Sequence, residues 1–184
     1  MMAFPESDVK YTYADYLTWP HEERWELIEG IPYAMAAPTT RHQKVLRKLC
    51  TEIDLFLRGK DCEVYPAPFS VVLEQGQGED TVVEPDLSII CDPTKLDEKG
   101  CKGAPDFIIE ILSPSTARHD RIVKFNKYLK AGVKEYWIVD PELNAVHAFI
   151  LRGNVYVATV YTEQDTLPIW TLPGLEINLQ EILS

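Results

Sequence analysis

Two kinds of hydrophobic spacing alternate along the chain, and together they predict a core of helices and strands. Apolar residues recur at helical spacing from about residue 41 to residue 57 and again from about 119 to 131. Short runs rich in β-branched and aromatic residues predict buried strands between and after these helices. The expected strands are 69–73, 82–91, the run between Pro105 and Pro114, and 135–140.

The segments outside this core predict smaller additions. Thr12 and Asp15 have the spacing of a capping box, which indicates a short helix through about Leu17. Residues 24–35 resemble two strands joined by a turn at Glu29 and Gly30, and residues 92–104 resemble a polar, mobile loop. Strands are also expected at 145–151, 155–161 and 167–170, before a last short helix at 179–183.

The order of the core elements predicts an α/β fold. The elements follow one another as helix, strand, strand, strand, helix, strand, and the crossover between residues 106 and 140 implies a parallel, right-handed connection. The earlier strands are joined by shorter loops and can be antiparallel. We therefore expect a mixed sheet flanked by helices, with an N-terminal hairpin and C-terminal β additions. A flexible N-terminus over residues 1–10 would precede a single domain over 11–184.

Composition restricts the class of protein. The 184 residues carry a net charge of −11, whereas generic nucleic-acid binders are basic, so binding of nucleic acid would need a local basic face, a metal or a basic partner. The four cysteines form no Cys-x-x-Cys pair, which favours reduced thiols in a cytoplasmic protein. The longest apolar runs fall short of the roughly 20 residues that span a bilayer, so no membrane segment is expected.

Glu110 is the most informative residue, because it stands alone among five large apolar residues of a predicted buried strand. A lone carboxylate is costly to remove from water, so it should have a cation, a hydrogen-bond partner or a function. Asp86 lies in a neighbouring predicted strand, and two carboxylates on one face can share a divalent cation such as Mg²⁺. The alternative is that Glu110 points to solvent or pairs with Arg121, and spacing alone does not decide.

The helix that follows this strand supplies a candidate cation. At about 100° per residue, Lys124 lies at the border of the apolar stripe and can reach the edge of the sheet beside Glu110. Lys127 and Lys130 project to the opposite side, where we expect an ordinary solvated face. Asp120 is placed where it stabilises the helix dipole, which needs no catalytic role.

Several segments resemble a bacterial family of restriction endonuclease-like proteins, long classed as a domain of unknown function and abundant in cyanobacteria. The resemblance extends from about Tyr11 to the C-terminus, and its specific part is the block from Glu110 to Pro141. The matching segments are Glu84-Pro85-Asp86-Leu87, the run from Asp106 to Thr116, the series Asp120, Lys124, Tyr128, Gly132 and Val133, the run from Glu135 to Pro141, and, upstream, Glu26 to Gly30 and the helix start at His42.

The resemblance implies the PD-(D/E)xK nuclease fold and a metal-dependent nuclease site. Asp86 and Glu110, with the backbone carbonyl of Ile111, would hold Mg²⁺ or Mn²⁺. The lysine usual two positions after the glutamate is absent, because Leu112 stands there. Lys124 on the next helix is the residue that would replace it.

Three further residues are candidates for completing this site. Glu29 or Glu26, and His42, would add a ligand or position a water molecule. The alternatives are that Glu29 is a turn residue beside Gly30, that Glu26 is a surface residue, and that His42 packs at the edge of the core.

Three functions are compatible with these residues. The first is a metal-dependent endonuclease that cuts double-stranded DNA. The second is a catalytically silent nuclease fold that binds nucleic acid or protein, and the third is a hydrolase of another phosphate diester. A homodimer is expected, since the C-terminal strands offer edges that need covering and cutting of a duplex commonly uses two sites.

Overall fold

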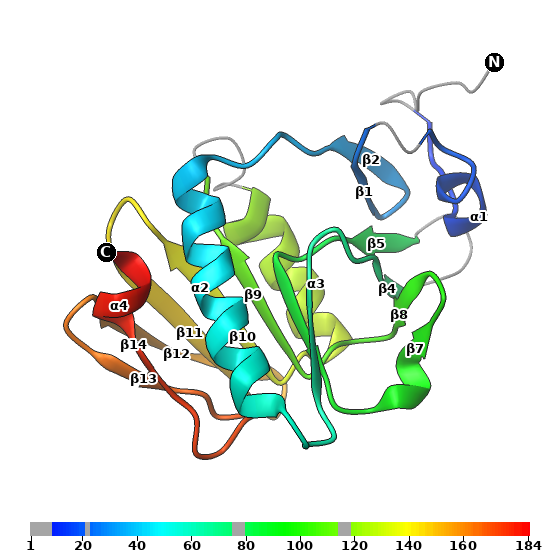
Figure 1. The fold of residues 1–184 in the computed structure, drawn as a ribbon. Helices are drawn as coiled ribbons and strands as arrows, with labels where there is room; N and C mark the ends of the chain where they lie inside the picture. Colours follow the sequence, from blue (N-terminus) through cyan, green and yellow to red (C-terminus); the bar gives the residue numbers. More distant parts are fainter. Residues whose placement is uncertain (1–8, 21–22, 75–79, 114–118) are drawn as a thin grey trace.

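The computed structural model describes residues 9–20, 23–74, 80–113 and 119–184. These form two six-stranded mixed sheets and a two-stranded sheet, with helices packed against them (Figure 1). The predicted turns at 75–79 and 114–118, and most of the N-terminal segment expected to be flexible, lie outside the described residues.

The core sheet has six strands in the order β12-β11-β10-β9-β6-β3. Their bounds are β3 Glu63–Pro66, β6 Leu87–Ile90, β9 Phe107–Ile111, β10 Glu135–Asp140, β11 Ala145–Arg152 and β12 Val155–Thr162. Only β9 and β10 are parallel within this sheet, and the helical crossover between them is the predicted one. The predicted core order of helix, three strands, helix and strand is therefore present as α2, β3, β6, β9, α3 and β10.

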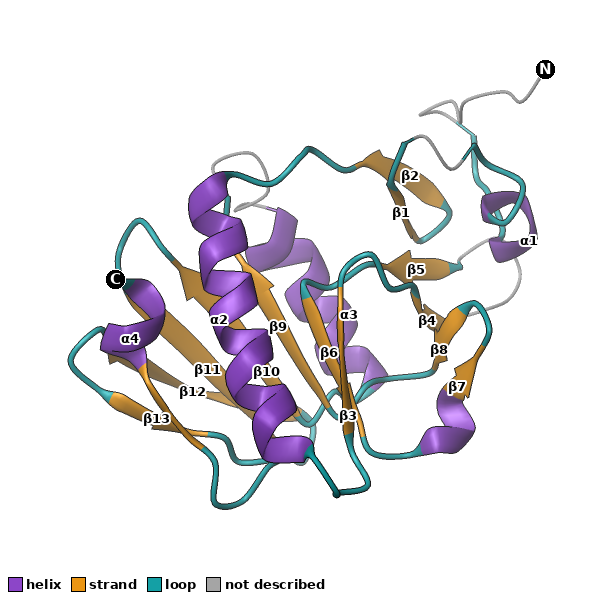
Figure 2. Ribbon diagram, viewed as in Figure 1, coloured by secondary structure: helices purple, strands orange, loops and turns teal. Residues whose placement is uncertain are grey.

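Two helices cover opposite faces of the core sheet (Figure 2). Helix α2, Thr40–Leu57, begins at the N-cap Thr39 and packs its apolar stripe on the face that carries Ile109 and Trp137. Helix α3, Phe125–Ala131, follows a π-helical turn (η2) at His119–Lys124 and ends at Gly132, which has a positive φ of 84°. Tyr128 of α3 packs on the other face of the sheet, together with Ile108 of β9. Glu110 points to this same face, because side chains two residues apart on a strand lie on one side.

The second sheet has the order β2-β1-β5-β4-β8-β7 and lies beside the core sheet (Figure 2). Its strands are β1 Trp25–Ile28, β2 Ile31–Ala34, β4 Val71–Glu74, β5 Thr81–Val83, β7 Leu96–Asp97 and β8 Gly100–Lys102. The hairpin β1–β2 and the short helix α1, Tyr13–Tyr16, with its Thr12–Asp15 capping box confirm the N-terminal predictions. The segment expected to be a loop from 92 to 104 instead contains a 3₁₀ turn (η1), Pro93–Lys95, and the pair β7–β8.

Prolines explain two of the differences between the predicted and the observed strands. The strand expected over 82–91 is two strands, β5 and β6, because Pro85 has no N–H to continue the hydrogen-bond ladder. The expected strand 69–73 corresponds to β4 of the second sheet, whereas the core position is taken by β3, in a segment thought irregular because of Pro66 and Pro68. Strand β3 is at the edge of its sheet, where proline is tolerated.

The C-terminal additions are close to those predicted. Strands β11 and β12 form a long antiparallel pair, followed by β13, Thr166–Pro168, and β14, Glu176–Asn178, of which β14 was not predicted. Helix α4, Leu179–Leu183, packs its apolar residues into the cluster below α2. None of the helices in the described ranges is long and apolar enough to cross a membrane.

The expectation of four reduced cysteines is wrong for one pair, because Cys62 and Cys91 form a disulfide. Cys62 precedes Glu63 and Cys91 follows Ile90, and these two neighbours are paired in the β3–β6 register. The register therefore brings the two thiols together across adjacent strands. Cys50 and Cys101 are free.

Candidate active site

The site lies at residues 84–86, where the chain leaves β5 of the second sheet and enters β6 of the core sheet. Leu87 of β6 pairs with Ile109 of β9 in antiparallel register, so Asp86 lies opposite the Glu110 end of that strand. The Asp86 Oδ2 atom accepts the backbone N–H of Ile111 at 2.7 Å. This hydrogen bond fixes the Asp86 carboxylate beside Glu110, as the sequence predicted for two neighbouring strands.

Glu110 is buried, with 3% of its surface exposed, and it points toward the helix that follows its strand. The Lys124 ammonium lies 2.9 Å from Glu110 Oε1, and the Tyr128 hydroxyl donates to the same oxygen at 2.6 Å. Burial and then the charge of Glu110 raise the pKa of Tyr128 well above its ordinary value, so this residue remains a hydrogen-bond donor at neutral pH. A solvent-facing Glu110 is therefore excluded. The partners of its carboxylate that the structure describes, Lys124 and Tyr128, are themselves buried.

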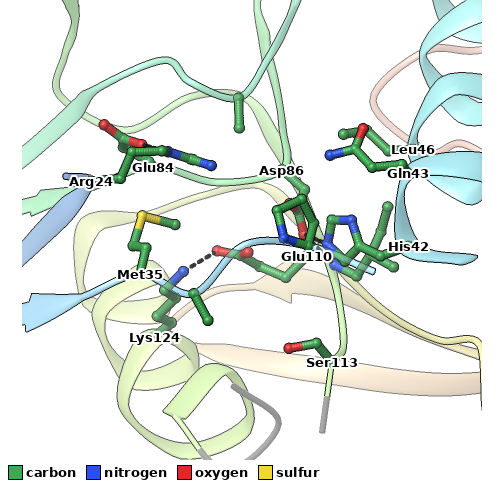
Figure 3. A pocket seen from close by; sticks show the side chains of 14 residues that line it. Arg24, Met35, His42, Gln43, Leu46, Glu84, Asp86, Glu110, Ser113 and Lys124 are labelled. Atoms are coloured by element: carbon green, nitrogen blue, oxygen red, sulfur yellow. Dashed lines mark hydrogen bonds and ion pairs between the residues drawn. The ribbon is translucent and has the colours of Figure 1, made fainter. Parts of the chain in front are cut away.

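Lys124 joins the two sheets through a second ion pair. Its Nζ atom lies 2.8 Å from Glu26 Oε1, and both side chains are almost fully buried. Glu26 comes from β1, and its Oε1 atom also accepts the backbone N–H of Glu84 at 2.9 Å. One ammonium therefore lies between a carboxylate of the core sheet and a carboxylate of the second sheet. Figure 3 shows Lys124 directed at Glu110.

His42 reaches the site from the first turn of α2. The Thr39 hydroxyl caps this turn by accepting the His42 N–H, and His42 Nε2 lies 3.1 Å from Asp86 Oδ2. The other ring nitrogen, Nδ1, is buried and has no hydrogen-bond partner within the described structure. His42 is thus a neighbour of Asp86 rather than a residue that only packs at the core edge.

Glu29 lies outside this cluster, although the sequence allowed either Glu29 or Glu26. It occupies the β1–β2 turn with a φ of 53°, and its side chain is 57% exposed. Lys127 approaches Glu29 at 2.7 Å, and this contact lowers the pKa of the Glu29 carboxyl. Lys127 also contacts Glu74 and is buried, so the prediction that it belongs to a solvated face is wrong, whereas Lys130 is exposed as expected. The Arg121 and Asp120 side chains lie outside the described residues.

Sequence reasoning gave no role to the pair formed by Arg24 and Glu84. The Arg24 guanidinium contacts Glu84 Oε2 at 2.8 Å, and Tyr16 donates to the other carboxylate oxygen at 3.4 Å. The available signal was the position of Glu84 directly before Pro85 and Asp86, where the chain leaves one sheet and enters the other.

A small pocket of about 60 Å³ connects these groups (Figure 3). Its lining includes His42, Asp86, Glu110, Ile111, Ser113 and Lys124. This volume accommodates an ion and a few water molecules, but not a whole nucleotide. Any ligand larger than an ion and a few water molecules must therefore extend beyond this pocket.

The donor set fits a hard divalent cation that keeps most of its water. Asp86 and Glu110 supply two carboxylates to one pocket, and Ile111 lines it beside them. Among the described residues no group of three or more His, Cys, Asp or Glu side chains is arranged to hold a metal. Mg²⁺ is commonly bound by one or two carboxylates and several waters, so two carboxylates are a sufficient protein contribution.

Three comparisons relate this arrangement to known proteins. The sequence profile of the family Uma2, described as "Putative restriction endonuclease", matches residues 13–180. An uncharacterized protein of Synechocystis sp. is 31% identical over 116 residues, which cover 62% of this chain and 60% of that protein. The crystal structure of a "putative nuclease belonging to DUF820" from Anabaena variabilis superposes with a TM-score of 0.77 at 20% identity, covering 94% of this chain and 99% of that one. The last match confirms the predicted nuclease-like α/β fold.

Proposed function

Because this chain belongs to the putative restriction endonuclease family, we propose that it is a metal-dependent endonuclease of the PD-(D/E)xK kind that hydrolyses phosphodiester bonds of DNA. The observation that carries this proposal is the convergence of Asp86, Glu110 and Lys124 on one small, largely buried pocket. Lysine and paired carboxylates at the end of a rigid strand are suited to hold a cation and to neutralise a phosphate.

Asp86 and Glu110, with the carbonyl of Ile111, are proposed to bind Mg²⁺ or Mn²⁺. Such an ion, when bound, lowers the pKa of a water ligand and stabilises negative charge on the phosphate. Neighbouring residues keep the two carboxylates in position. His42 and the Ile111 N–H hold the Asp86 carboxylate, and the Tyr128 hydroxyl holds Glu110.

Lys124 is proposed to contact the substrate phosphate. Its ammonium is fixed by Glu110 and Glu26, so it is presented to the pocket without the loss of side-chain freedom that a surface lysine would undergo. A positive group fixed before the substrate arrives stabilises the charge that develops in the transition state. Glu26, rather than Glu29, is the acidic residue of the N-terminal hairpin that supports this arrangement.

The proposed substrate is a polyanion, and one surface supports this choice over a small diester. Four basic residues on the first half of α2 form what we call the α2 basic ridge, made of Arg41, Lys44, Arg47 and Lys48. The first three are exposed, and no acidic residue occurs between Thr39 and Thr51. Burial, followed by repulsion from Lys44 and Arg47, lowers the pKa of Lys48. The ridge thus gathers basic side chains of the helix that carries His42, in a chain of net charge −11, with Glu163 beside Arg41 and Lys44 in one cavity lining.

The primary test is cleavage of supercoiled plasmid in Mg²⁺ or Mn²⁺, with chelator as the blank, alongside hydrolysis of bis(4-nitrophenyl) phosphate. Metal-dependent conversion of plasmid to open-circle and linear forms is expected. Turnover of the small diester without plasmid cutting would instead favour a hydrolase of another phosphate diester. Retention of DNA with neither activity would favour a silent nucleic-acid binding module.

Neutralising the ridge is expected to weaken binding of DNA without affecting the chemical step. Arg41→Gln, Lys44→Gln and Arg47→Gln together should reduce the slope of log K against log salt concentration by about 2–3, since each phosphate contact contributes about 0.9. Fluorescence anisotropy with a labelled duplex measures this slope. Hydrolysis of the small diester should stay unchanged.

A matched control removes the same charge elsewhere. Arg58, Lys60 and Lys130 are exposed and lie at the far end of α2 or on α3. Their replacement with glutamine should leave the salt slope close to that of the parent protein. Equal slopes for the ridge and control variants would show that the ridge does not bind the DNA backbone.

We also propose that two copies associate, as duplex cutting by two sites requires. Strand β12 is an edge of the core sheet in the described structure. Its residues Val155, Val157 and Val160 are each more than half exposed, which favours a protein partner over water at this edge. Sedimentation velocity should give about twice the 21.0 kDa of the chain, and Val157→Lys should shift the species toward the monomer. A monomer at micromolar concentration in the parent protein would contradict this association.

A further inference from the structure

The catalytic pocket is too small for a nucleotide, but a second and larger pocket adjoins it. This neighbouring pocket has a volume of about 720 Å³, within the range of pockets that hold small organic ligands. Arg24 and Glu84 line both pockets. A substrate whose phosphate lies near Asp86 could therefore extend past Arg24 into this second space.

Aromatic rings form much of the wall of the second pocket. Tyr16, Trp19 and Trp25 line it, and Trp19 makes edge contacts with Tyr16 at 5.3 Å and with Trp25 at 6.1 Å between ring centroids. In both contacts the rings meet edge to face, with interplanar angles of 62° and 70°, rather than stacking in parallel. Leu17, Pro20 and Pro68 complete the apolar part of the lining.

Two of the aromatic residues that line the pocket carry polar groups that suit a heterocyclic ring. The Trp25 Nε1 atom is buried and has no acceptor among the residues that the structure describes. The Tyr16 hydroxyl interacts with Ser70 and Glu84, and burial raises its pKa to about 12, so it stays protonated at neutral pH. Lys99 is exposed at the rim, where it can contact a backbone phosphate.

We propose that this aromatic pocket binds one nucleobase of the substrate strand, next to the phosphate that is cut. The inference rests on the proposed function and narrows its substrate. A nucleobase is planar, stacks on aromatic side chains and offers ring nitrogen or carbonyl acceptors to a buried N–H such as that of Trp25. The base would have to leave its helical stack to enter, so a duplex substrate would have to be unstacked or distorted at this position, which is easiest at a mismatched or damaged base.

The test measures binding rather than cleavage, so that it can succeed or fail independently of the proposed function. A labelled short oligothymidylate and its abasic counterpart, which has the same backbone but no bases, are titrated in chelator by fluorescence anisotropy. The parent protein is expected to bind the intact strand about tenfold more tightly, as one stacked base requires. Tryptophan emission should be quenched by the intact strand and not by the abasic strand.

Trp25→Phe keeps an aromatic ring but removes the N–H, and it should reduce the preference for the intact strand to about threefold or less. Trp170→Phe is the matched control, because Trp170 is 47% exposed, packs over Arg152 and lies outside the pocket. It should keep the full preference. Circular dichroism verifies the fold of both variants, and Ser70→Leu, which narrows the pocket without changing Trp25, should also lower the preference.

The outcomes separate the two proposals. Equal binding of intact and abasic strands by the parent protein, or equal preferences in the Trp25 and Trp170 variants, would overturn the nucleobase pocket even if plasmid is cut. A base-dependent preference that Trp25→Phe lowers would support the pocket even if no metal gives cleavage.

Discussion

Asp86→Asn is expected to lower metal-dependent DNA cleavage by about 10²–10³-fold with little change in stability. An amide has no negative charge to hold a divalent cation, but its oxygen can still accept the Ile111 N–H that the carboxylate accepts at 2.7 Å. The local backbone should therefore keep its position while the affinity for metal falls. Plasmid cleavage rates and calorimetric titration with Mn²⁺ measure the two effects separately.

Asp106→Asn provides the control for this substitution. Asp106 is also buried and also accepts a backbone N–H, from Cys91 at 2.8 Å, but it pairs with Lys134 at the opposite end of β9. Its replacement should affect stability and leave cleavage and Mn²⁺ affinity near the parent values. Cleavage by the Asp86 variant at the parent rate would remove Asp86 from the catalytic site.

Lys124→Met is expected to abolish cleavage and to lower the free energy of unfolding by about 3–5 kcal/mol. The substitution preserves the length of the side chain but removes its charge, which leaves Glu26 and Glu110 buried without the ammonium between them. The two buried ion pairs of Lys124 are the reason to expect a loss of stability together with the loss of cleavage. Urea unfolding followed by circular dichroism gives the magnitude.

Added metal makes this second prediction more specific. Mg²⁺ or Mn²⁺ should stabilise the Lys124 variant more than the parent protein, because a divalent cation can supply charge that the methionine lacks. Lys130→Met is the control, since Lys130 is exposed and pairs with Glu74 at 2.8 Å, an interaction worth at most about 1 kcal/mol. Similar losses of stability in the two variants would show that the buried ion pairs of Lys124 with Glu26 and Glu110 do not stabilise the packing of the two sheets.

Local patterns, together with the family resemblance, pointed to the centre of the candidate site. An isolated Glu110 in an apolar strand indicated an unusual environment. An assumed α-helical period placed Lys124 beside it, and the structure has Lys124 at the end of the π-helical turn η2. Both inferences use spacing within one element or across one short connection, which the regular geometry of helices and strands determines. The Asp86–Glu110 neighbourhood needed only the assumption that their strands pair.

Contacts between the two sheets were harder to predict because they depend on tertiary placement. Glu26 and Glu29 belong to one hairpin, and only the position of that hairpin relative to α3 distinguishes the buried partner of Lys124 from the turn residue that meets Lys127. The Cys62–Cys91 disulfide depends on the β3–β6 register. Strand β3 was not predicted, because its segment contains prolines, which an edge strand can tolerate. Burial of Lys127 likewise required knowledge of Glu74 on the second sheet.

The passage from β5 to β6 has a consequence for how the chain can change in evolution. Within three consecutive residues, the Glu84 N–H binds Glu26, Pro85 ends one ladder and Asp86 binds the Ile111 N–H. Inserting or deleting one residue here would turn a carboxylate to the wrong face and separate the two sheets from their shared lysine. The spacing from Glu84 to Asp86 should therefore remain fixed for as long as selection maintains the site.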